Sequence, residues 1–253
     1  MQGRVAIVTG GSSGIGRAVA AELLGRGMRV VVTSRSAERA AKTASELGGD
    51  AVGVAAQLTD VDGPQALVQG VLARCGRVDV LVNNAGAGQV AESETLDPGE
   101  FQRIIDLNLT ATFLCAQAAA RPMLAAGRGV IVNISSLMGH VGLARRAAYT
   151  ASKHGIEGLT KTLAVEWASR GVRVMSVSPA YVATPLLAET SKAGGFTMDD
   201  VAGRTPLGRL AESEEVARVV AFLVSDDASY LTGSSVLVDG GWLADGGWEH
   251  GGS

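Results

Sequence analysis

The chain has 253 residues, a formal net charge of −3 and 47% hydrophobic residues, of which few are aromatic. This length suits one α/β domain with a large aliphatic core. The charged residues are spread along the chain, so the sequence does not indicate the clustered basic surface of a nucleic-acid-binding protein. No apolar run reaches the ~18 residues of a membrane span, and no signal peptide precedes the first apolar segment. We therefore expect a soluble, cytoplasmic protein.

Short apolar segments rich in β-branched residues alternate with longer helical patterns along the chain. The predicted strands are Arg4–Thr9, Arg29–Ser34, Ala51–Ala55, Val78–Asn83, Gly129–Ile134, Val172–Ser178 and Ser235–Asp239. Most are continuous apolar runs, which is typical of parallel strands buried on both faces. The predicted helices are Gly14–Arg26, Ala37–Leu47, Val61–Cys75, Asp97–Ala125, Ala148–Ser169 and Ser213–Val224. This alternation predicts an α/β fold with a doubly wound, seven-stranded parallel sheet and helices on both faces.

Two stretches depart from this alternation. Residues 186–209 contain no clear strand and a mixed pattern, and long irregular insertions in compact domains are usually functional lids or mobile loops. We interpret this insertion as a substrate loop, with an ordinary surface excursion as the alternative. Residues 240–253 form a glycine-rich tail that carries Trp242 and Trp248, and a frayed terminus is the expectation there.

A glycine cluster follows the first predicted strand and opens the first predicted helix. Its sequence is Thr9-Gly10-Gly11-Ser12-Ser13-Gly14-Ile15-Gly16. Glycines let the backbone turn tightly and approach a pyrophosphate, and the N-terminus of the next helix presents free N–H groups. The position between strand and helix predicts a dinucleotide site rather than a structural turn. The expected contacts are Gly10, Ser12, Ser13, Gly14, Ile15 and Gly16.

The end of the second predicted strand distinguishes NAD from NADP. NAD sites place an acidic residue there to bond the ribose 2′-hydroxyl, whereas this chain has Ser34 and Arg35 and no carboxylate. Ser34 can donate to a 2′-phosphate, and Arg35 can pair with it bidentately. We therefore expect NADP(H), and a solvated loop arginine is the alternative for Arg35. The turn Asn83-Asn84-Ala85-Gly86 should line the same cleft, because ligands bind beyond the carboxyl ends of parallel strands.

Tyr149 and Lys153 are four residues apart in a predicted helix, and Ser136 precedes the tyrosine by thirteen residues. Positions i and i+4 share a helix face, so the phenol and the ammonium can point into one site. A free phenol has a pKa of about 10. A nearby cation lowers that pKa toward the range in which a general acid or base works at neutral pH. The three residues therefore form a candidate catalytic set.

Together these motifs resemble those of the classical short-chain dehydrogenases/reductases over nearly the whole chain. The matching residues are Thr9-Gly10-x-x-x-Gly14-x-Gly16, Asn83-Asn84-Ala85-Gly86, Asn108, Ser136, Tyr149-x-x-x-Lys153, Pro179 and Thr184. The resemblance implies a single-domain Rossmann fold over residues 1–253. It also implies an enzyme that moves hydride between NADP(H) and a small carbonyl or alcohol substrate, and assembly as a homotetramer.

The resemblance assigns roles to individual residues. Tyr149 is the general acid in reduction and the general base in oxidation, Lys153 lowers the tyrosine pKa and bonds the nicotinamide ribose, and Ser136 hydrogen-bonds the substrate oxygen. Asn108 holds a water in a proton relay to the lysine. The remaining implied cofactor contacts are Leu58, Asn84, Ala85, Gly86, Pro179, Val182 and Thr184. Three departures from the family pattern stand out. Gln57-Leu58 replaces the Asp-Val that the family often has against adenine, and Ala180 replaces a glycine. Ser12 and Ser13 stand where many NADP-dependent members carry a lysine or arginine, so Arg35 must carry most of the 2′-phosphate recognition.

Three substrate classes remain open: ketones or secondary alcohols, 3-oxoacyl thioesters, and sugars or polyols. The expected substrate contacts are Ser136, Leu137, Met138, Val141 and Tyr149, and their largely apolar character favours hydrophobic ketones. Arg145 and Arg146 follow this segment; they could contact an acyl-carrier phosphopantetheine, but a solvated turn is the preferred interpretation. A dinucleotide-binding sensor without turnover is the non-enzyme alternative, and the complete serine, tyrosine and lysine set argues against it.

The cysteines and histidines indicate neither a disulfide nor a metal site. Cys75 and Cys115 lie in apolar helical stretches and are expected to be buried free thiols. His140 lies in a loop that should border the substrate pocket, where a substrate contact is a minor alternative. His154 should point away from the catalytic face, and His250 lies in the tail. Because none of them has a second ligand nearby, we expect no metal.

Overall fold

The structure is a computed structural model and describes residues 1–246. Seven parallel strands form one sheet in the order β3-β2-β1-β4-β5-β6-β7. The strands are β1 (Val5–Val8), β2 (Arg29–Ser34), β3 (Ala51–Ala55), β4 (Val80–Asn83), β5 (Gly129–Ile134), β6 (Val172–Pro179) and β7 (Ser235–Val238). The strand order reverses between β1 and β4, which is the arrangement of a Rossmann fold. The predicted doubly wound, seven-stranded parallel sheet is confirmed.

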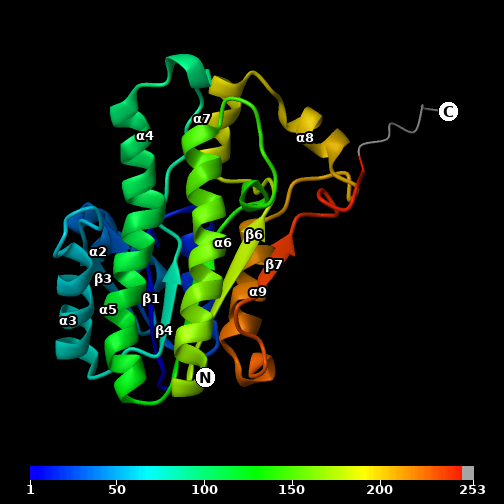
Figure 1. Cartoon of the computed structure of the whole chain (residues 1–253). Helices are drawn as coiled ribbons and strands as arrows, with labels where there is room; N and C mark the ends of the chain where they lie inside the picture. The colour runs from blue at the N-terminus through cyan, green and yellow to red at the C-terminus, as the bar shows by residue number, and fades with distance from the viewer. Residues whose placement is uncertain (247–253) are drawn as a thin grey trace.

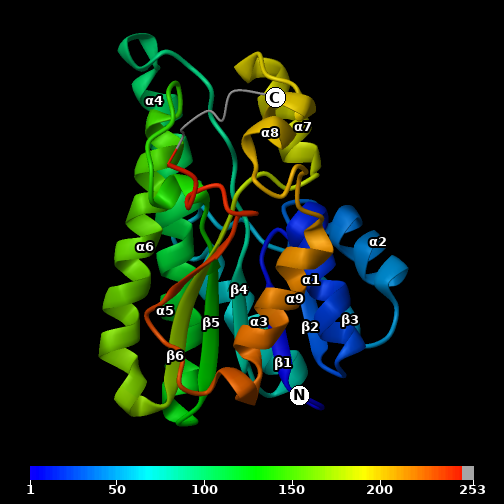
Figure 2. The same cartoon turned by 90° about the vertical axis from the view of Figure 1, so that its right-hand side faces the viewer.

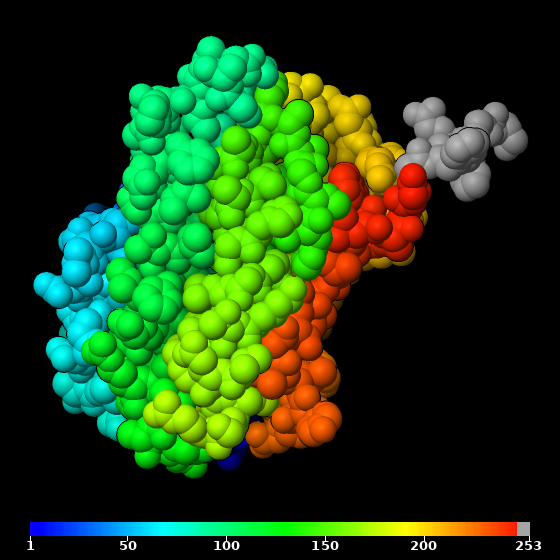
Figure 3. All heavy atoms as spheres, viewed as in Figure 1, coloured from blue at the N-terminus to red at the C-terminus, as the bar shows by residue number. Residues whose placement is uncertain are grey.

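Helices cover both faces of the sheet (Figures 1 and 2). The helices α1 (Gly14–Gly25), α2 (Ala37–Leu47) and α9 (Ser213–Val224) lie on one face. On the other face lie α3 (Gly63–Cys75), α5 (Ala111–Ala125) and α6 (Ala147–Trp167), and α5 and α6 face the viewer in Figure 3. Short helical turns connect these elements at η1 (Ser93–Thr95), η3 (Leu137–Gly139), η4 (Ala168–Arg170) and η5 (Asp226–Ala228).

The strand β1 shows why its segment is apolar throughout. Successive side chains of a strand point to opposite faces of the sheet. Ala6 and Val8 therefore join the core beneath α1 and α9, while Val5 and Ile7 join the core beneath α3 and α5. Full burial of a side chain such as Ile7 contributes about 1.5–3 kcal/mol, so both faces select aliphatic residues.

The helix expected over residues 97–125 is interrupted. It consists of α4 (Pro98–Ile105), the π-helical turn η2 (Asp106–Thr110) and α5. Asp97 caps its start by accepting a hydrogen bond of 3.0 Å from the Glu100 amide, and Pro98 occupies the first turn, where a missing N–H costs nothing. The π-turn inserts one extra residue, a feature often found at functional sites. It contains Asn108, which is fully buried.

The expectation of an irregular insertion at residues 186–209 is wrong. This region forms α7 (Pro185–Gly194) and α8 (Met198–Arg204), which lie beyond the carboxyl ends of the strands (Figures 1 and 2). Thr184 caps α7 by accepting from the Leu187 amide at 3.3 Å, and Thr197 forms a capping box at the start of α8. Gly195 ends α7 with a φ of 71°. Two such short helices give too few turns for a periodic pattern to stand out.

The tail is ordered as far as the structure describes it. The Asp239 carboxylate accepts hydrogen bonds from the amides of Gly241 and Leu243 at 3.0 and 2.9 Å. Arg204 of α8 pairs with Asp245 at 2.6 Å and lies 4.5 Å from the ring centroid of Trp242. The expectation of fraying is therefore wrong for residues 240–246, while Trp248 and His250 lie outside the described residues.

No helix within residues 1–246 is both long enough and apolar enough to span a membrane. Within the same residues, no group of three or more His, Cys, Asp or Glu side chains could hold a metal ion.

Candidate active site

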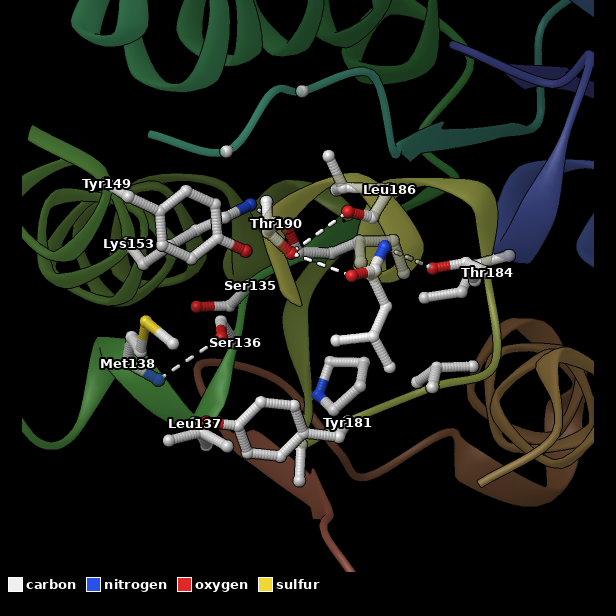
Figure 4. Close-up of a pocket in the computed structure, with 18 of the residues that line it drawn as sticks. Ser135, Ser136, Leu137, Met138, Tyr149, Lys153, Tyr181, Thr184, Leu186 and Thr190 are labelled. Carbon is white, nitrogen blue, oxygen red and sulfur yellow. Dashed lines mark hydrogen bonds between the residues drawn. The ribbon is translucent and has the colours of Figure 1, made fainter. Parts of the chain in front are cut away.

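A cavity lies beyond the carboxyl ends of the central strands and is covered by α7 (Figure 4). Tyr149 and Lys153 enter it from α6, and Ser136 enters it from the residues that follow β5. Its remaining wall comes from the turn after β4, the segment after β6 and α7. The lining residues outside the catalytic set are Ile15, Asn84, Gly86, Ala87, Gly88, Ile134, Ser135, Leu137, Met138, Arg146, Pro179, Ala180, Tyr181, Val182, Thr184, Leu186, Leu187, Thr190 and Phe196. We call this space the active-site cavity.

The glycine turn requires glycine at specific positions. Gly10 has a φ of 60°, and a Cβ there would lie 2.9 Å from the Cα of Ala85. A Cβ on Gly16 would collide with the Asn84 amide and the Gly10 carbonyl. The Asn84 side chain donates to the carbonyls of Thr9 and Gly10 at 3.0 and 3.1 Å. The asparagine motif after β4 therefore holds the glycine turn in place.

The turn ends at the N-terminus of α1. Ser13 is the N-cap residue, and no side chain caps this helix end, so the first amides of α1 are available to an anion. Gly14 has a φ of 48°, which favours glycine. Ile15 lines the active-site cavity, whereas Ser12 does not.

The residues expected at the adenosine end follow β2 and β3. Ser34 is half-buried, and its hydroxyl accepts from the Ser36 amide at 3.3 Å. Arg35 is exposed and has no ion-pair or hydrogen-bond partner in the described part of the chain. Leu58 is buried in the core beneath α3, so only its backbone can contact a ligand.

Ser136 and Tyr149 interact across the active-site cavity. Burial raises the pKa of the Tyr149 phenol, while the hydrogen bond with Ser136 and the positive charge of Arg146 lower it. The Ser136 hydroxyl also accepts from the Met138 amide at 3.2 Å. The sequence predicted that Lys153 would lower this pKa; instead burial raises the pKa overall, and the opposing effects come from Ser136 and Arg146.

Lys153 is buried beside the tyrosine. Its Nζ donates to the Ile134 carbonyl at 2.8 Å and lies 5.5 Å from the centroid of the Tyr149 ring. Burial lowers the pKa of Lys153 to about 8, against the opposing effect of the Glu157 carboxylate. The ammonium thus loses its proton far more readily than an exposed lysine does.

Asn108 lies behind the cavity rather than in its wall. Its amide donates to the Ala87 carbonyl at 3.0 Å and to the Ser152 hydroxyl at 3.1 Å. Its Oδ1 accepts from the Ala87 amide at 2.9 Å. The side chain therefore fixes the loop after β4 against α6.

An apolar wall faces the catalytic residues, and the sequence identified only part of it. Leu137 and Met138 lie in the wall as expected, but Val141 does not, because the turn η3 carries the chain past the cavity. The further members are Tyr181, Leu186, Leu187, Thr190 and Phe196. The Tyr181 ring packs edge-on against Phe196 and also contacts Trp242, with ring centroids 5.9 and 6.4 Å apart. One feature of the sequence pointed to these residues: the insertion at residues 186–209 follows β6, so it had to lie beyond the carboxyl ends of the strands, where ligands bind.

Arg146 overturns the solvated-turn interpretation. Only 6% of its surface is exposed, and it lines the active-site cavity. Arg146 precedes the first residue of α6 and has non-helical backbone, so helical spacing from Tyr149 could not have placed it in the cavity. Arg145, by contrast, points outward, with its Nε 3.0 Å from Glu92.

The remaining polar candidates lie outside the cavity. His140 does not contact it; its Nε2 lies 3.1 Å from the hydroxyls of both Ser178 and Ser235. His154 is exposed on α6, as predicted. Both cysteines are free thiols, but only Cys115 is buried, and Cys75 is half-buried because it ends α3.

The comparison with protein families and curated relatives agrees with this geometry. The family described as enoyl-(acyl carrier protein) reductase matches residues 10–243. The chain is 43% identical to the cis-4-hydroxycyclohexanecarboxylate dehydrogenase of Sinomonas cyclohexanicum, over 94% of this chain and 96% of that protein. It is 41% identical to the cyclohexanol dehydrogenase of an Acinetobacter species, over 94% of each. It is 40% identical to the D-threitol dehydrogenase of Mycolicibacterium smegmatis, over 96% and 94%.

Solved structures give the same result. A short-chain type dehydrogenase/reductase from Mycobacterium marinum superposes with a TM-score of 0.91 and 34% identity, over 96% of this chain and 97% of that one. A protein from Beutenbergia cavernae, described as an NAD(P)-dependent gluconate 5-dehydrogenase with NADP bound at low occupancy, superposes with a TM-score of 0.90 and 39% identity, over 97% and 98%. The chain therefore belongs to the short-chain dehydrogenase/reductase family of nicotinamide-dependent oxidoreductases.

Proposed function

We propose that this chain is an NADP(H)-dependent oxidoreductase that interconverts apolar ketones and secondary alcohols. The observation that carries this proposal is the meeting of Ser136, Tyr149 and Lys153 in one cavity, against a wall of apolar side chains. A protein that only binds dinucleotides has no use for a buried phenol beside a buried ammonium.

The shape of the glycine turn fits a dinucleotide. Gly10 and Gly16 let the turn pack closely against Asn84 and Ala85, and the uncapped start of α1 offers amides to a pyrophosphate. The Pro179 to Thr184 segment lines the cavity at Pro179, Val182 and Thr184, where a nicotinamide carboxamide would lie.

The preference for NADP(H) rests on the end of β2. Arg35 is exposed there without a partner, and no carboxylate follows the strand. A guanidinium pairs bidentately with phosphate, whereas an acid at this place would repel it. The NADP in the related Beutenbergia structure supports the same preference.

The catalytic residues divide the chemistry between them. When bound, NADPH supplies the hydride to the carbonyl carbon. Tyr149 donates its phenolic proton to the carbonyl oxygen, and Ser136 donates a hydrogen bond to the same oxygen as negative charge develops on it. In the direction of alcohol oxidation, the Tyr149 phenolate takes up the proton.

Lys153 and Asn108 assist the proton transfer by Tyr149. The Lys153 ammonium stabilises the phenolate through its charge and would bond the nicotinamide ribose. With a pKa of about 8, Lys153 can also pass a proton on at neutral to mildly alkaline pH. We assign Asn108 to the end of this proton relay remote from Tyr149. Its side chain fixes the loop after β4 against α6, and the π-turn displaces its backbone from regular helical spacing.

The apolar wall favours ring or chain ketones over polyols. The hydroxyl of Thr190 donates to the carbonyls of Leu186 and Leu187 at 2.9 and 3.2 Å (Figure 4), so its proton is not available to a sugar hydroxyl. Two relatives named above act on cyclohexanol and hydroxycyclohexanecarboxylate, which are six-membered rings of this kind. A 3-oxoacyl thioester is less favoured, because Arg146 is buried and Arg145 contacts Glu92.

The test is oxidation of NADPH in the presence of cyclohexanone, erythrulose or an acetoacetyl thioester, followed by absorbance. Cyclohexanone should give the highest kcat/KM of the three. A higher kcat/KM for erythrulose or for the acetoacetyl thioester would instead assign the chain to the polyol or the 3-oxoacyl thioester class. No turnover of any carbonyl, with NADPH bound normally, would favour the sensor alternative.

A further inference from the structure

Arg146 is a buried cation without an anionic partner. Its single hydrogen bond within the described residues is a long one, 3.4 Å, from Nη1 to the carbonyl of Arg145. No carboxylate of residues 1–246 lies within ion-pair distance of it, although ten ion pairs of other arginines or lysines form over the same residues. Buried charges in proteins are normally paired, so this guanidinium lacks a counter-charge.

The backbone before Arg146 is arranged to turn it inward. Arg145 has a φ of 63° and is the single non-glycine residue with a positive φ in the described chain. Such strained backbone persists only where its surroundings enforce it, and here the Arg145 carbonyl accepts from the Ala91 amide at 3.1 Å and from the Gln89 side chain at 3.3 Å. The turn sends Arg145 toward Glu92 on the surface and Arg146 into the active-site cavity.

The surroundings of Arg146 mark the substrate end of the cavity. The guanidinium packs against the end of α7, since a Cβ on Gly194 would lie 3.1 Å from its Nη2. Phe196 lies against the same glycine. The charge of Arg146 also acts on the phenols of Tyr149 and Tyr181, lowering the pKa of each. These contacts place the cation close to the reacting groups and under the cover formed by α7.

The charged side chains that line the active-site cavity are all cationic. Among its described lining residues, two are cationic, Arg146 and Lys153, and none is Asp or Glu. Lys153 donates to the Ile134 carbonyl and is committed to the tyrosine, so Arg146 is the cation left for a ligand. A guanidinium stays protonated at neutral pH and presents paired N–H donors that match a carboxylate.

We propose that Arg146 binds a carboxylate of the substrate, so that the chain acts on oxo or hydroxy carboxylic acids. This inference rests on the proposed oxidoreductase function and refines its substrate class, from uncharged apolar ketones to apolar ketones that carry a carboxylate away from the carbonyl. The carboxylate lies at one end of the ligand, beneath α7, and the carbonyl lies at the other end, at Ser136 and Tyr149. The apolar side chains Leu137, Met138 and Phe196 contact the hydrocarbon between the two ends.

A binding measurement tests Arg146 without any turnover. Calorimetric titration of cyclohexanecarboxylate into the protein with saturating NADPH is compared with titration of cyclohexanecarboxamide, which has the same shape and no charge. We expect the acid to bind about 10- to 100-fold more tightly, the range of one charge-assisted contact. Arg146→Met should remove that difference, and Arg145→Met, which changes the adjacent outward-facing arginine, should keep it. Equal binding of acid and amide to the wild type would overturn the proposal.

A kinetic comparison separates this inference from the proposed function. The substrates are 4-oxocyclohexanecarboxylate and its methyl ester. We expect the acid to have the higher kcat/KM by a similar factor, mainly through KM, and Arg146→Met to abolish the ratio. Since Arg146 also acts on the phenol of Tyr149, the variant can lower kcat for both substrates, so the ratio is the decisive quantity. Turnover of both substrates with no preference rejects the carboxylate site alone, whereas turnover of neither rejects the proposed function while the calorimetry still decides the role of Arg146.

Discussion

The Nζ of Lys153 lies 5.5 Å from the centroid of the Tyr149 ring and donates its hydrogen bond to the Ile134 carbonyl. The lysine therefore lies over the face of the tyrosine ring, and its hydrogen bond goes to the backbone rather than to the phenol oxygen. Burial has opposite effects on the two residues, since it raises the pKa of Tyr149 and lowers that of Lys153. Burial thus stabilises the protonated phenol of Tyr149 and the deprotonated amine of Lys153, because both of these forms are neutral.

The pKa of Lys153 predicts a dependence of stability on pH. Its pKa is about 8 in the folded chain and about 10.4 when exposed, so the unfolded chain binds more protons between these values. The free energy of unfolding should therefore rise with pH across this interval. Relative to Lys153→Met, the wild type should gain up to roughly 3 kcal/mol between pH 7 and pH 10, measured by urea unfolding. Lys161→Met, an exposed lysine on the same helix, controls for the loss of a charge, and a difference that stays constant with pH would contradict the assignment.

Arg35 predicts the cofactor preference. The wild type should bind NADPH more tightly than NADH, and Arg35→Ala should weaken NADPH binding by about tenfold or more while leaving NADH nearly unchanged, because one charge-assisted contact to phosphate is lost. Fluorescence titration of both cofactors measures this. Arg74→Ala, an exposed arginine on α3, should change neither affinity. Equal affinities in the wild type would reject the preference for NADP(H).

The sequence predicted the sheet because most of the strands are continuous apolar segments, and β1 and β2 begin and end within one residue of the expected positions. Gly10, Gly16, Ser136, Tyr149 and Lys153 were found because their chemistry depends on residue type and spacing. What it missed depends on packing. Arg146 resembles a surface arginine until the positive φ of Arg145 turns it inward, and the π-turn at Asn108 leaves no trace in the periodicity of its helix.

Trp242 predicts a role for the tail in shaping the cavity. It packs between Tyr181 and Arg204, so it links the cavity wall to α8. Trp242→Ala should lower the free energy of unfolding by about 1–2 kcal/mol, through the loss of a half-buried ring and a cation–π contact. It should also raise KM for ketones several-fold with little change in NADPH affinity. An unchanged KM in steady-state assays would separate the tail from the substrate site.

Exposed apolar residues on α5 and α6 lead us to expect that the chain forms an oligomer. Phe113 on α5 and Val165 on α6 are exposed apolar side chains, and Val165 is 83% exposed. Association would remove such apolar surface from water. We expect a dimer or tetramer by light scattering at micromolar concentration, with Val165→Glu shifting it toward smaller species. Val61→Glu changes an equally exposed valine near the start of α3 and serves as the control. A wild-type monomer would contradict the expected homotetramer.

Replacing Ser136 should show how much its hydrogen bond to the substrate oxygen contributes to kcat. Ser136→Ala removes one donor to the developing negative charge, and kcat should fall by about 10²–10³. Because the hydrogen bond with Ser136 also lowers the pKa of Tyr149, its loss should raise that pKa, and the rising, low-pH limb of the profile for alcohol oxidation should move to higher pH. Steady-state rates from pH 6 to pH 11 measure both effects, and a variant with normal kcat and an unmoved profile would exclude Ser136 from the reaction.

The most direct test follows deuterium from [4-²H]NADPH to the carbinol carbon of cyclohexanol, with cyclohexanone as substrate and mass spectrometry as the readout. The wild type should transfer the label. Tyr149→Phe should bind NADPH with nearly unchanged affinity but transfer label about 10²–10⁴ times more slowly, since it loses the proton donor and little else. If Tyr149→Phe transfers the label at close to the wild-type rate, Tyr149 is not the acid of this reaction and the proposed mechanism is wrong.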